Sequence, residues 1–380
     1  MKKHEPAKVF LLMANNPSTP YFSRFAKVSH RNPEVALTFV ALCPDKPSML
    51  DEMEALGCAC HWVRFDSKAR KRGFLVSVVK LYLLFRKYRP DVVHTHLFDD
   101  ALPGLLAAWL AGVRCRVISK LDAGFHHLYT PQWVFLDRLN NRLSTAIVAV
   151  SEANREFVLK TEGADPAKVT VIHQGLPASE VTTRSATIQK ELRRRFQLGD
   201  EKVVLTVARF VDIKGYPDLI AAAKIAASRH ADVRFICVGY GELREHFESM
   251  ALSQGLAGKI LFSDWISREE LNNLFGLATI YLHAALVEPF GFTIAEAMFN
   301  GTPVVSTNVG AARDGLEHKV SAYLVAPGDS QGLADGITFM LSADRGPIAA
   351  RAKLAATDLF SIEAMWLKHV QLYLRCVQPT

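Results

Sequence analysis

Short apolar runs alternate with amphipathic stretches along most of this chain. Residues 8–13 and 36–42 are continuous apolar runs, as expected of strands that are buried on both faces of a parallel sheet. Further strand-like runs lie at 60–63, 90–96, 117–120, 146–150 and 169–172, and the stretches between them have helical spacing. The alternation predicts parallel βαβ units in the N-terminal half.

A second alternation begins after a polar stretch. Residues 177–185 are predicted to be a linker, and residues 182–191 to be irregular. Strand-like runs then lie at 203–207, 233–238, 260–262, 280–282 and 304–306, with helical stretches at 216–230, 243–253, 268–277 and 293–300. The last amphipathic helix covers 362–377. This pattern predicts a second α/β domain of the same doubly wound kind.

The two alternations predict two Rossmann-like domains. The first would comprise residues 1–177, against which the C-terminal helix at 360–380 packs; the second would comprise residues 186–357. Ligands bind outside the C-terminal ends of parallel strands. We therefore expect two doubly wound sheets that face each other across a cleft.

Composition agrees with two domains and favours anionic partners. The chain has 380 residues, 49% of them hydrophobic, which is enough for two buried cores. A net charge of +7 suits anionic partners. The 6 cysteines form no C-x-x-C pair, which favours reduced thiols in a cytoplasmic protein. Residues 9–14 are predicted to be a first strand and not a signal peptide, and no apolar run approaches the roughly 20 residues that span a bilayer.

Two carboxylates, Glu288 and Glu296, lie eight positions apart in the stretch on which the functional argument depends. Glu288 should follow a strand, and Glu296 should lie about one turn into the next helix. Gly291 lets a ligand approach the backbone, and Thr293 is placed to cap that helix. Free N–H groups of a first helical turn suit a phosphate, while carboxylates accept hydrogen bonds from sugar hydroxyls. The alternative is an ordinary capped helix with two exposed glutamates.

Two cations accompany this stretch. Arg209 and Lys214 lie at the end of the first strand of the second half and in the loop after it. Both can reach a diphosphate, and fixed cations stabilise the charge that builds up as such a group leaves. No metal would then be needed, and no D-x-D motif occurs in the chain. The alternative for both residues is surface salt bridging.

These residues resemble a known family. Residues 288–296 are similar to the E-x7-E motif of retaining glycosyltransferases of family 4 (glycosyl transferases group 1), which have the GT-B fold. Similar family segments are V-A-R-F-V-D-I-K-G at 207–215, V-G-Y-G-E-L-R at 238–244, N-G-T-P-V-V at 300–305, V-H-T-H-L-F at 93–98 and the stretch 151–155. The similarity covers nearly the whole chain in the family's order.

The resemblance implies that residues 1–177 bind the acceptor and residues 186–357 bind the donor. It implies a UDP- or GDP-linked sugar as co-substrate and no other cofactor. It implies that Arg209 and Lys214 act on the diphosphate, that Glu288 holds sugar hydroxyls, and that Glu296 holds the ribose. The remaining donor-binding residues that it implies are Phe290, Gly291 and Phe292 through their amides, Trp265 and Ile266 beside the base, and Thr293 and Gly239.

The acceptor side departs from the family pattern. The family has a Gly-Gly pair in its first loop, where this chain has N-N-P-S-T-P at 15–20, with Asn16 as the acceptor-side candidate. Relatives also carry a histidine just after the strand that corresponds to 117–120. Here His126 or Asp122 takes that role, or the role is lost. His126 is the catalytic candidate, and Asp122 and His127 are acceptor-side candidates. A histidine in an F-H-H loop is otherwise a packing residue.

Two further features concern partners. Residues 68–89 have basic ends around an apolar middle. Such a stretch suits an anionic membrane surface and a lipid-linked acceptor, although a core-packed helix with solvated charges has the same pattern. His94 and His96 share one strand face and are interpreted as packing residues, with no third metal ligand beside them. No nucleic-acid-binding module is found.

Three kinds of function remain open. The first is a retaining, metal-independent glycosyltransferase of the hexosyltransferase type, in synthesis of a bacterial surface polysaccharide, lipopolysaccharide or glycolipid, on the inner face of the cytoplasmic membrane. The second is a catalytically weak subunit that binds nucleotide-sugar within a glycan-assembly complex. The third, a two-carboxylate glycoside hydrolase, is disfavoured because Arg209 and Lys214 point to a phosphate.

Overall fold

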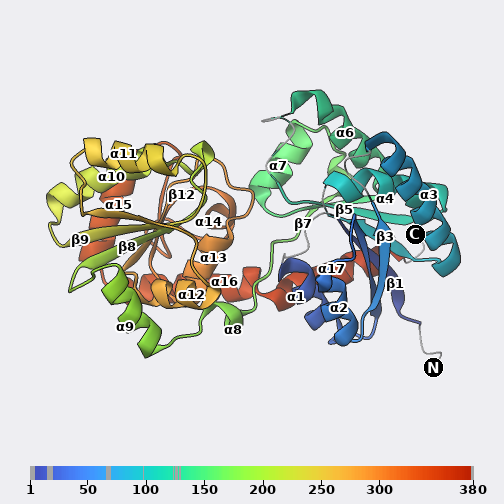
Figure 1. Cartoon of the computed structure of the whole chain (residues 1–380), viewed down its shortest axis with the longest axis horizontal. Helices are drawn as coiled ribbons and strands as arrows, with labels where there is room; N and C mark the ends of the chain where they lie inside the picture. The colour runs from blue at the N-terminus through green and yellow to red at the C-terminus, as the bar shows by residue number, and fades with distance from the viewer. Residues whose placement is uncertain are drawn as a thin grey trace. The chain divides into compact units, whose positions relative to one another are not determined.

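The computed structural model describes residues 5–14, 20–65, 70–96, 98–122, 124, 127 and 130–377. The chain divides into two compact units (Figure 1). Unit 1 contains residues 1–175 and 362–380, and unit 2 contains residues 176–361. Residues 177–185, predicted to be a linker, therefore belong to unit 2. No helix among the described residues is both long and apolar enough to cross a membrane.

Unit 1 contains one parallel sheet of 7 strands in the order β3-β2-β1-β4-β5-β6-β7. Its strands are β1 (Ala7–Ala14), β2 (Val35–Cys43), β3 (Ala59–Arg64), β4 (Val92–Thr95), β5 (Cys115–Lys120), β6 (Ala146–Ala149) and β7 (Val169–Val171). The apolar runs predicted as strands are therefore confirmed. Strands buried on both faces have few polar positions, which is why these runs are continuous.

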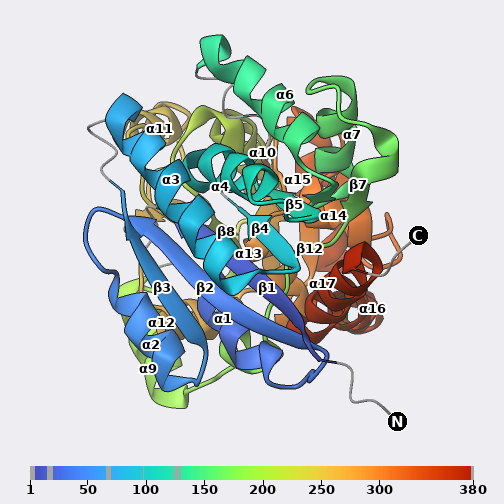
Figure 2. The same cartoon turned by 90° about the vertical axis from the view of Figure 1, so that its right-hand side faces the viewer.

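Helices cover both faces of the unit 1 sheet (Figure 2). One face is covered by α1 (Pro20–Ser29), α2 (Ser48–Ala55) and α17 (Ile362–Val377), and the other by α3 (Arg70–Tyr88), α4 (Phe98–Leu110) and α7 (Glu152–Lys160). The remaining helical segments of unit 1 are η2 (Pro131–Trp133), α6 (Val134–Leu143) and η3 (Pro166–Lys168). Ser151 caps α7 by accepting a hydrogen bond from the Asn154 amide at 3.1 Å, as predicted.

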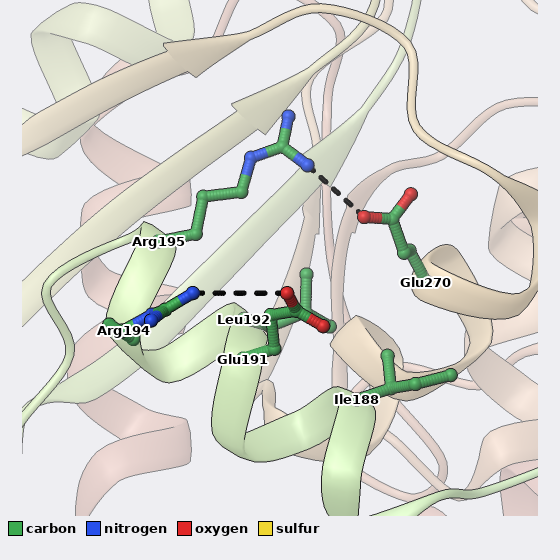
Figure 3. A pocket seen from close by; sticks show the side chains of 6 residues that line it. All are labelled: Ile188, Glu191, Leu192, Arg194, Arg195 and Glu270. Atoms are coloured by element: carbon green, nitrogen blue, oxygen red, sulfur yellow. Dashed lines mark hydrogen bonds and ion pairs between the residues drawn. The ribbon is translucent and has the colours of Figure 1, made fainter.

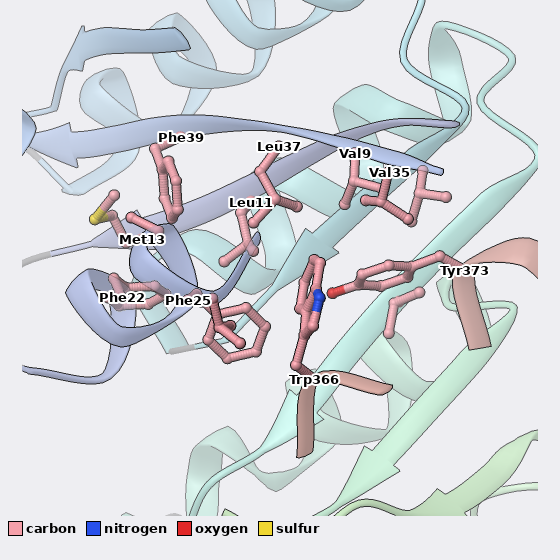
Figure 4. Packing of buried hydrophobic residues seen from close by; sticks show 14 of the residues in the cluster. Val9, Leu11, Met13, Phe22, Phe25, Val35, Leu37, Phe39, Trp366 and Tyr373 are labelled. Carbon is pink, nitrogen blue, oxygen red and sulfur yellow. The ribbon is translucent and has the colours of Figure 1, made fainter. Parts of the chain in front are cut away.

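The C-terminal helix α17 is part of the unit 1 core. Trp366 and Tyr373 point from this helix among the apolar side chains of β1 and α1, including Leu11 and Phe25 (Figure 4). The Trp366 and Phe25 rings pack edge to face at 5.9 Å. The chain therefore returns to its first domain after completing the second, and the amphipathic pattern of 362–377 is explained by this packing.

Unit 2 contains a parallel sheet of 6 strands in the order β10-β9-β8-β11-β12-β13. Its strands are β8 (Lys202–Val207), β9 (Val233–Val238), β10 (Ile260–Ser263), β11 (Ile280–His283), β12 (Val304–Thr307) and β13 (Tyr323–Val325). The strand order reverses between β8 and β11, which are paired directly. In doubly wound sheets a ligand binds at such a switch point, beyond the C-terminal ends of the two strands.

Helices pack on both faces of the unit 2 sheet (Figure 1). On one face lie α10 (Tyr216–Arg229), α11 (Arg244–Ser253) and α15 (Ser330–Ser342), and on the other lie α9 (Ala186–Arg195), α12 (Arg268–Leu277), α13 (Phe292–Asn300), α14 (Gly310–Gly315) and α16 (Arg345–Phe360). The short segments α8 (Ala178–Val181) and η4 (Asp212–Lys214) complete the unit. Both units are thus Rossmann-like, which confirms the predicted fold class.

One local prediction was wrong. Residues 182–191 were predicted to be irregular, but α9 begins at Ala186 and is capped by the Ser185 hydroxyl, which accepts from the Ile188 amide at 3.4 Å. Only Leu192 of this helix is buried, so the apolar spacing that reveals an amphipathic helix is nearly absent. The elements between 310 and 360 were not predicted.

Candidate functional site

The loops after β8 and β11 bring together residues that were predicted to bind the diphosphate and the sugar. Lys214 ends η4 in the loop after β8, and Glu288 lies in the loop after β11. The Leu286 amide donates to the Ile213 carbonyl at 2.9 Å, so one backbone is fixed to the other. The pairing of β8 with β11 therefore places two residues distant in sequence at the switch point of the sheet.

Lys214 and Glu288 form a close ion pair. The distance from Lys214 Nζ to Glu288 Oε2 is 2.5 Å, and both side chains are only 11% exposed. Burial would raise the pKa of the Glu288 carboxyl, but contacts with His283 and Lys214 outweigh it and lower that pKa to about 2. Glu288 is therefore ionised at neutral pH, and it can accept hydrogen bonds from hydroxyl groups.

A chain of polar side chains extends from Glu288 into β11. His283 Nε2 lies 3.4 Å from Glu288 Oε2, and His283 Nδ1 lies 3.1 Å from the Tyr281 hydroxyl. The Tyr281 hydroxyl in turn makes a 2.6 Å hydrogen bond to Thr293 Oγ1. Tyr281 and His283 were not predicted as site residues. Their sequence signal was two polar rings at alternate positions of a buried strand that ends just before Glu288.

The first turn of α13 presents uncapped amides. Its N-cap is Gly291, in the left-handed region at φ 87°, and no side chain caps the helix. The predicted cap by Thr293 was wrong, because Thr293 lies inside the first turn and bonds to Tyr281 instead. Phe290 is buried, and its ring packs 5.3 Å from that of Phe360. The ring is therefore not available to a ligand, and Phe290 can contact one only through its backbone. Uncapped N–H groups at a helix start suit an anion.

Glu296 lies in α13, is 3% exposed, and is ion-paired with Arg268 of α12 at 2.7 Å. Glu288 is paired with Lys214 instead, so the two carboxylates of the motif have different cationic partners. Arg268 was not predicted. Its position in the first turn of the helix before the motif gave no signal, because only the packing of α12 against α13 brings it to Glu296.

Arg209 is exposed in the loop after β8, and no described residue forms an ion pair or hydrogen bond with its guanidinium. This loop packs against the turn after β9: the Phe210 amide donates to the Tyr240 carbonyl at 2.8 Å. A Cβ atom at Gly239 would lie 1.9 Å from the Ala208 carbonyl oxygen, so only glycine permits this approach. The predicted donor-binding Gly239 thus supports the loop that carries Arg209.

Two exposed aromatic rings lie at the ends of β9 and β10. The Trp265 and Tyr240 rings pack edge to face at 5.9 Å, and Asp264 beside them is ion-paired with Arg244. Exposed aromatic faces can stack on a base. The side chain of Ile266, predicted beside the base, is buried, so it can contact a ligand there only through its backbone.

The acceptor-side candidates lie in unit 1. Asp122 accepts a hydrogen bond from the Gly124 amide at 2.7 Å, and its carbonyl accepts from Asn154 Nδ2 at 2.6 Å. His127 packs edge to face on Phe157 of α7 at 5.2 Å. Asn16 and His126 lie outside the described residues.

His94 and His96 belong to the unit 1 core. His94 lies 2.7 Å from the Tyr373 hydroxyl through Nδ1 and 2.8 Å from the Ser119 hydroxyl through Nε2. His96 Nδ1 lies 3.1 Å from the Leu12 carbonyl. Burial lowers the pKa of both imidazoles. Both histidines are held by hydrogen bonds inside the core, which agrees with their interpretation as packing residues.

A separate depression lies between α9 and α12 (Figure 3). Its charged side chains are already paired: Arg195 with Glu270 at 3.1 Å, and Arg194 with Glu191 at 3.9 Å. Glu270 also completes the capping box of α12 with Ser267. These charges serve the local structure, and no residue of the predicted site lines this depression.

Unit 2 therefore gathers the groups that a phosphorylated sugar compound requires. Lys214, the exposed Arg209 and the uncapped start of α13 suit a diphosphate, while Glu288 and Glu296 suit neutral hydroxyls. Within the described ranges no cluster of three or more histidine, cysteine, aspartate or glutamate side chains could hold a metal ion.

Two family models match the chain. The model of "Glycosyl transferases group 1" matches residues 188–357, and that of "Glycosyltransferase Family 4" matches residues 33–180. The first match covers the switch point of unit 2, and the second covers most of the unit 1 sheet.

Individual relatives agree with these models. An uncharacterised glycosyltransferase of Methanocaldococcus jannaschii is 28% identical over 54% of this chain and 53% of its own length, so the chain spans about half the length of that relative. The capsular polysaccharide biosynthesis glycosyltransferase CapM of Staphylococcus aureus is 24% identical over 79% of this chain and 80% of its own. The structure of HepE from Anabaena, in complex with UDP and glucose, matches with a TM-score of 0.76 and 20% identity over 96% of this chain and 99% of its own.

Proposed function

This chain belongs to the group 1 glycosyltransferases of the GT-B fold, and from that premise we propose that it moves a sugar from a nucleotide-sugar donor to a glycan or lipid-linked acceptor. The donor is a UDP- or GDP-linked hexose. The transfer retains the anomeric configuration and needs no metal ion.

The observation that carries this proposal is the Lys214–Glu288 pair beside the uncapped start of α13. Fixed positive charge next to free N–H groups supports binding of a diphosphate, and it supports its departure when the sugar–oxygen bond breaks. An ionised, buried Glu288 supports holding of sugar hydroxyls at the same point. Because these groups are already in place, little reorganisation is needed when charge develops on the leaving group.

Two relatives support a role in bacterial surface glycans. CapM acts in capsular polysaccharide biosynthesis, as its name states. A relative from Escherichia coli, 24% identical over 67% of this chain, is named as a galactosyltransferase that acts on a diphosphoundecaprenol-linked sugar. By analogy, the acceptor of this chain is a growing polysaccharide, lipopolysaccharide or glycolipid, and a lipid-linked acceptor would place the reaction at a membrane surface.

Calorimetric titration with UDP, GDP and ADP in metal-free buffer tests the donor site. One nucleotide should bind the wild-type protein, and Lys214→Ala should weaken it at least about tenfold, or about 1.4 kcal/mol. Lys224→Ala, an exposed lysine in the next helix, is the matched control and should bind as the wild type does. If no nucleotide binds, the donor site is disproved.

Transfer assays with the sugars of the bound nucleotide then test catalysis. Nuclear magnetic resonance of the anomeric proton in donor and product reports retention or inversion, and addition of a chelator reports metal dependence. Nucleotide binding without transfer to any acceptor would instead identify a binding subunit.

A further inference from the structure

Helices α3 and α4 of unit 1 lie side by side on one face of the sheet (Figure 2). Their inner sides pack in the core through residues such as Val78, Leu81 and Phe85 of α3 and Ala107 and Ala108 of α4. The sequence left two interpretations of residues 68–89, which contain α3, open: a core-packed helix or a membrane-surface helix. The inner side is core, so the question concerns the outer side alone.

The outer side of α3 is apolar. Leu75, Val76, Val79 and Leu83 are all exposed, with Leu75 at 64% and Leu83 at 59%. Their spacing places them along one stripe of the helix. Single exposed apolar residues are common on proteins, but four along one helical stripe form a surface that water solvates poorly.

Helix α4 also carries exposed apolar side chains. Trp109, 55% exposed, and Leu110 lie in the last turn of α4, the helix that packs beside α3. A tryptophan with an apolar ring and a polar N–H suits the boundary between lipid tails and headgroups. We call the six exposed side chains of the two helices the α3–α4 surface.

Positive charge borders this surface. Lys80, Arg86 and Lys87 are exposed on α3, and Arg89 is exposed directly after it. Residues 70–89 contain no aspartate or glutamate, and no acidic side chain of α4 is exposed among those described. Basic residues beside an apolar helical stripe attract an anionic lipid surface while the apolar side chains enter it.

A small pocket lies where α3 and α4 end. It is lined by Phe85, Arg86, Arg89 and Pro90 from the end of α3, and by the segment 111–113 that follows α4. Two arginines line this pocket. Arginine binds phosphate through paired N–H donors, so the pocket suits a phosphate. The pocket lies at the same ends of the helices as Leu83, Trp109 and Leu110.

From the apolar stripe, the one-sided charge and the arginine pocket, we propose that the α3–α4 surface docks the protein on an anionic phospholipid bilayer. Leu75, Val79, Leu83 and Trp109 enter the interfacial layer, and Arg86 and Arg89 take a lipid phosphate in the pocket. This role is independent of the donor site in unit 2.

Sedimentation of the full chain with vesicles tests the proposal. The wild-type protein should bind vesicles of phosphatidylglycerol and phosphatidylethanolamine at least about thirty-fold more tightly than phosphatidylcholine vesicles, and added salt should weaken that binding. Leu75→Ser with Leu83→Ser should reduce binding at least about tenfold. The matched control, Leu252→Ser with Leu354→Ser, changes leucines that are 63% and 64% exposed in unit 2 and should bind as the wild type does.

The charge contribution is tested separately. Arg86→Gln with Arg89→Asn should weaken binding to anionic vesicles about thirty-fold and leave weak binding to neutral vesicles unchanged. Asparagine is chosen because Arg89 has a φ of 49°, which asparagine tolerates. Bromine-labelled lipid tails should quench tryptophan fluorescence in the wild-type protein, and Trp109→Phe should remove most of that quenching.

Several results would overturn the proposal. These are equal binding to anionic and neutral vesicles, no binding to either, or an equal loss in the Leu252 and Leu354 control. Binding of UDP in solution is measured without vesicles, so a failure of membrane docking and a failure of the donor site give different results.

Discussion

Lys214 Nζ lies 2.5 Å from Glu288 Oε2, although 74 positions separate the two residues in the chain. The pair joins the loop after β8 to the loop after β11 at the switch point of the unit 2 sheet. One partner suits a phosphate and the other suits sugar hydroxyls. The pair also means that Glu288 already offsets part of the Lys214 charge before any ligand arrives.

Glu288→Gln should separate nucleotide binding from sugar transfer. Without the carboxylate, Lys214 is free to attract the diphosphate, so UDP affinity should stay within about threefold or increase. Transfer should fall about 100-fold or more, because the sugar is no longer held in place. Titration calorimetry and initial rates measure the two effects. Glu191→Gln, on the surface of α9, is the control; a parallel loss of UDP affinity and transfer by Glu288→Gln would contradict the assigned role.

Stability should depend on pH through Glu288. Its pKa is lowered from 4.5 to about 2 in the folded protein, so the unfolded chain binds more protons between these values. The stabilisation, about 3 kcal/mol from a shift of this size, is fully present above about pH 4.5 and is lost as the pH falls toward 2. Urea unfolding of the wild type and Glu288→Gln should show a smaller difference in unfolding free energy at pH 3 than at pH 6. The same difference at both pH values would refute this.

Arg209→Ala should affect binding without affecting stability. The guanidinium is exposed and has no described partner, so the melting temperature should change by only about 1 °C. UDP should bind about tenfold or more weakly, because a charge-assisted contact with the diphosphate is lost. Arg229→Ala is the matched control: it breaks a 2.6 Å ion pair with Asp335 and should leave UDP binding unchanged. Equal UDP affinity in wild type and Arg209→Ala would remove Arg209 from the site.

Glu296→Gln should reduce discrimination at the ribose. If the carboxylate accepts a hydrogen bond from the 2′-hydroxyl, the wild type should bind UDP about tenfold more tightly than 2′-deoxy-UDP. In the variant this ratio should fall below about threefold. Glu269→Gln, an exposed carboxylate in α12, controls for loss of charge. An unchanged ratio in Glu296→Gln would remove Glu296 from recognition of the ribose.

Local patterns predicted the regular elements well where one side of an element is apolar. The helix predicted at 362–377 has those bounds in the structure, because Trp366 and Tyr373 recur on its buried face. Helix α9 was missed because almost nothing of it is buried. The Thr293 cap was wrong because the helix begins one residue earlier than predicted, so Thr293 lies inside the first turn, where its hydroxyl bonds to Tyr281.

The sequence by itself determined the two α/β domains and the residue types of the donor site, because buried strands require continuous apolar runs and because Arg209, Lys214, Glu288 and Glu296 stand in the spacing of a family. Only the tertiary structure decided which groups meet. Lys214 reaches Glu288 because β8 pairs with β11, and Arg268 reaches Glu296 because α12 packs on α13. Contacts between residues far apart in the chain depend on strand order and helix packing, and no local pattern encodes them.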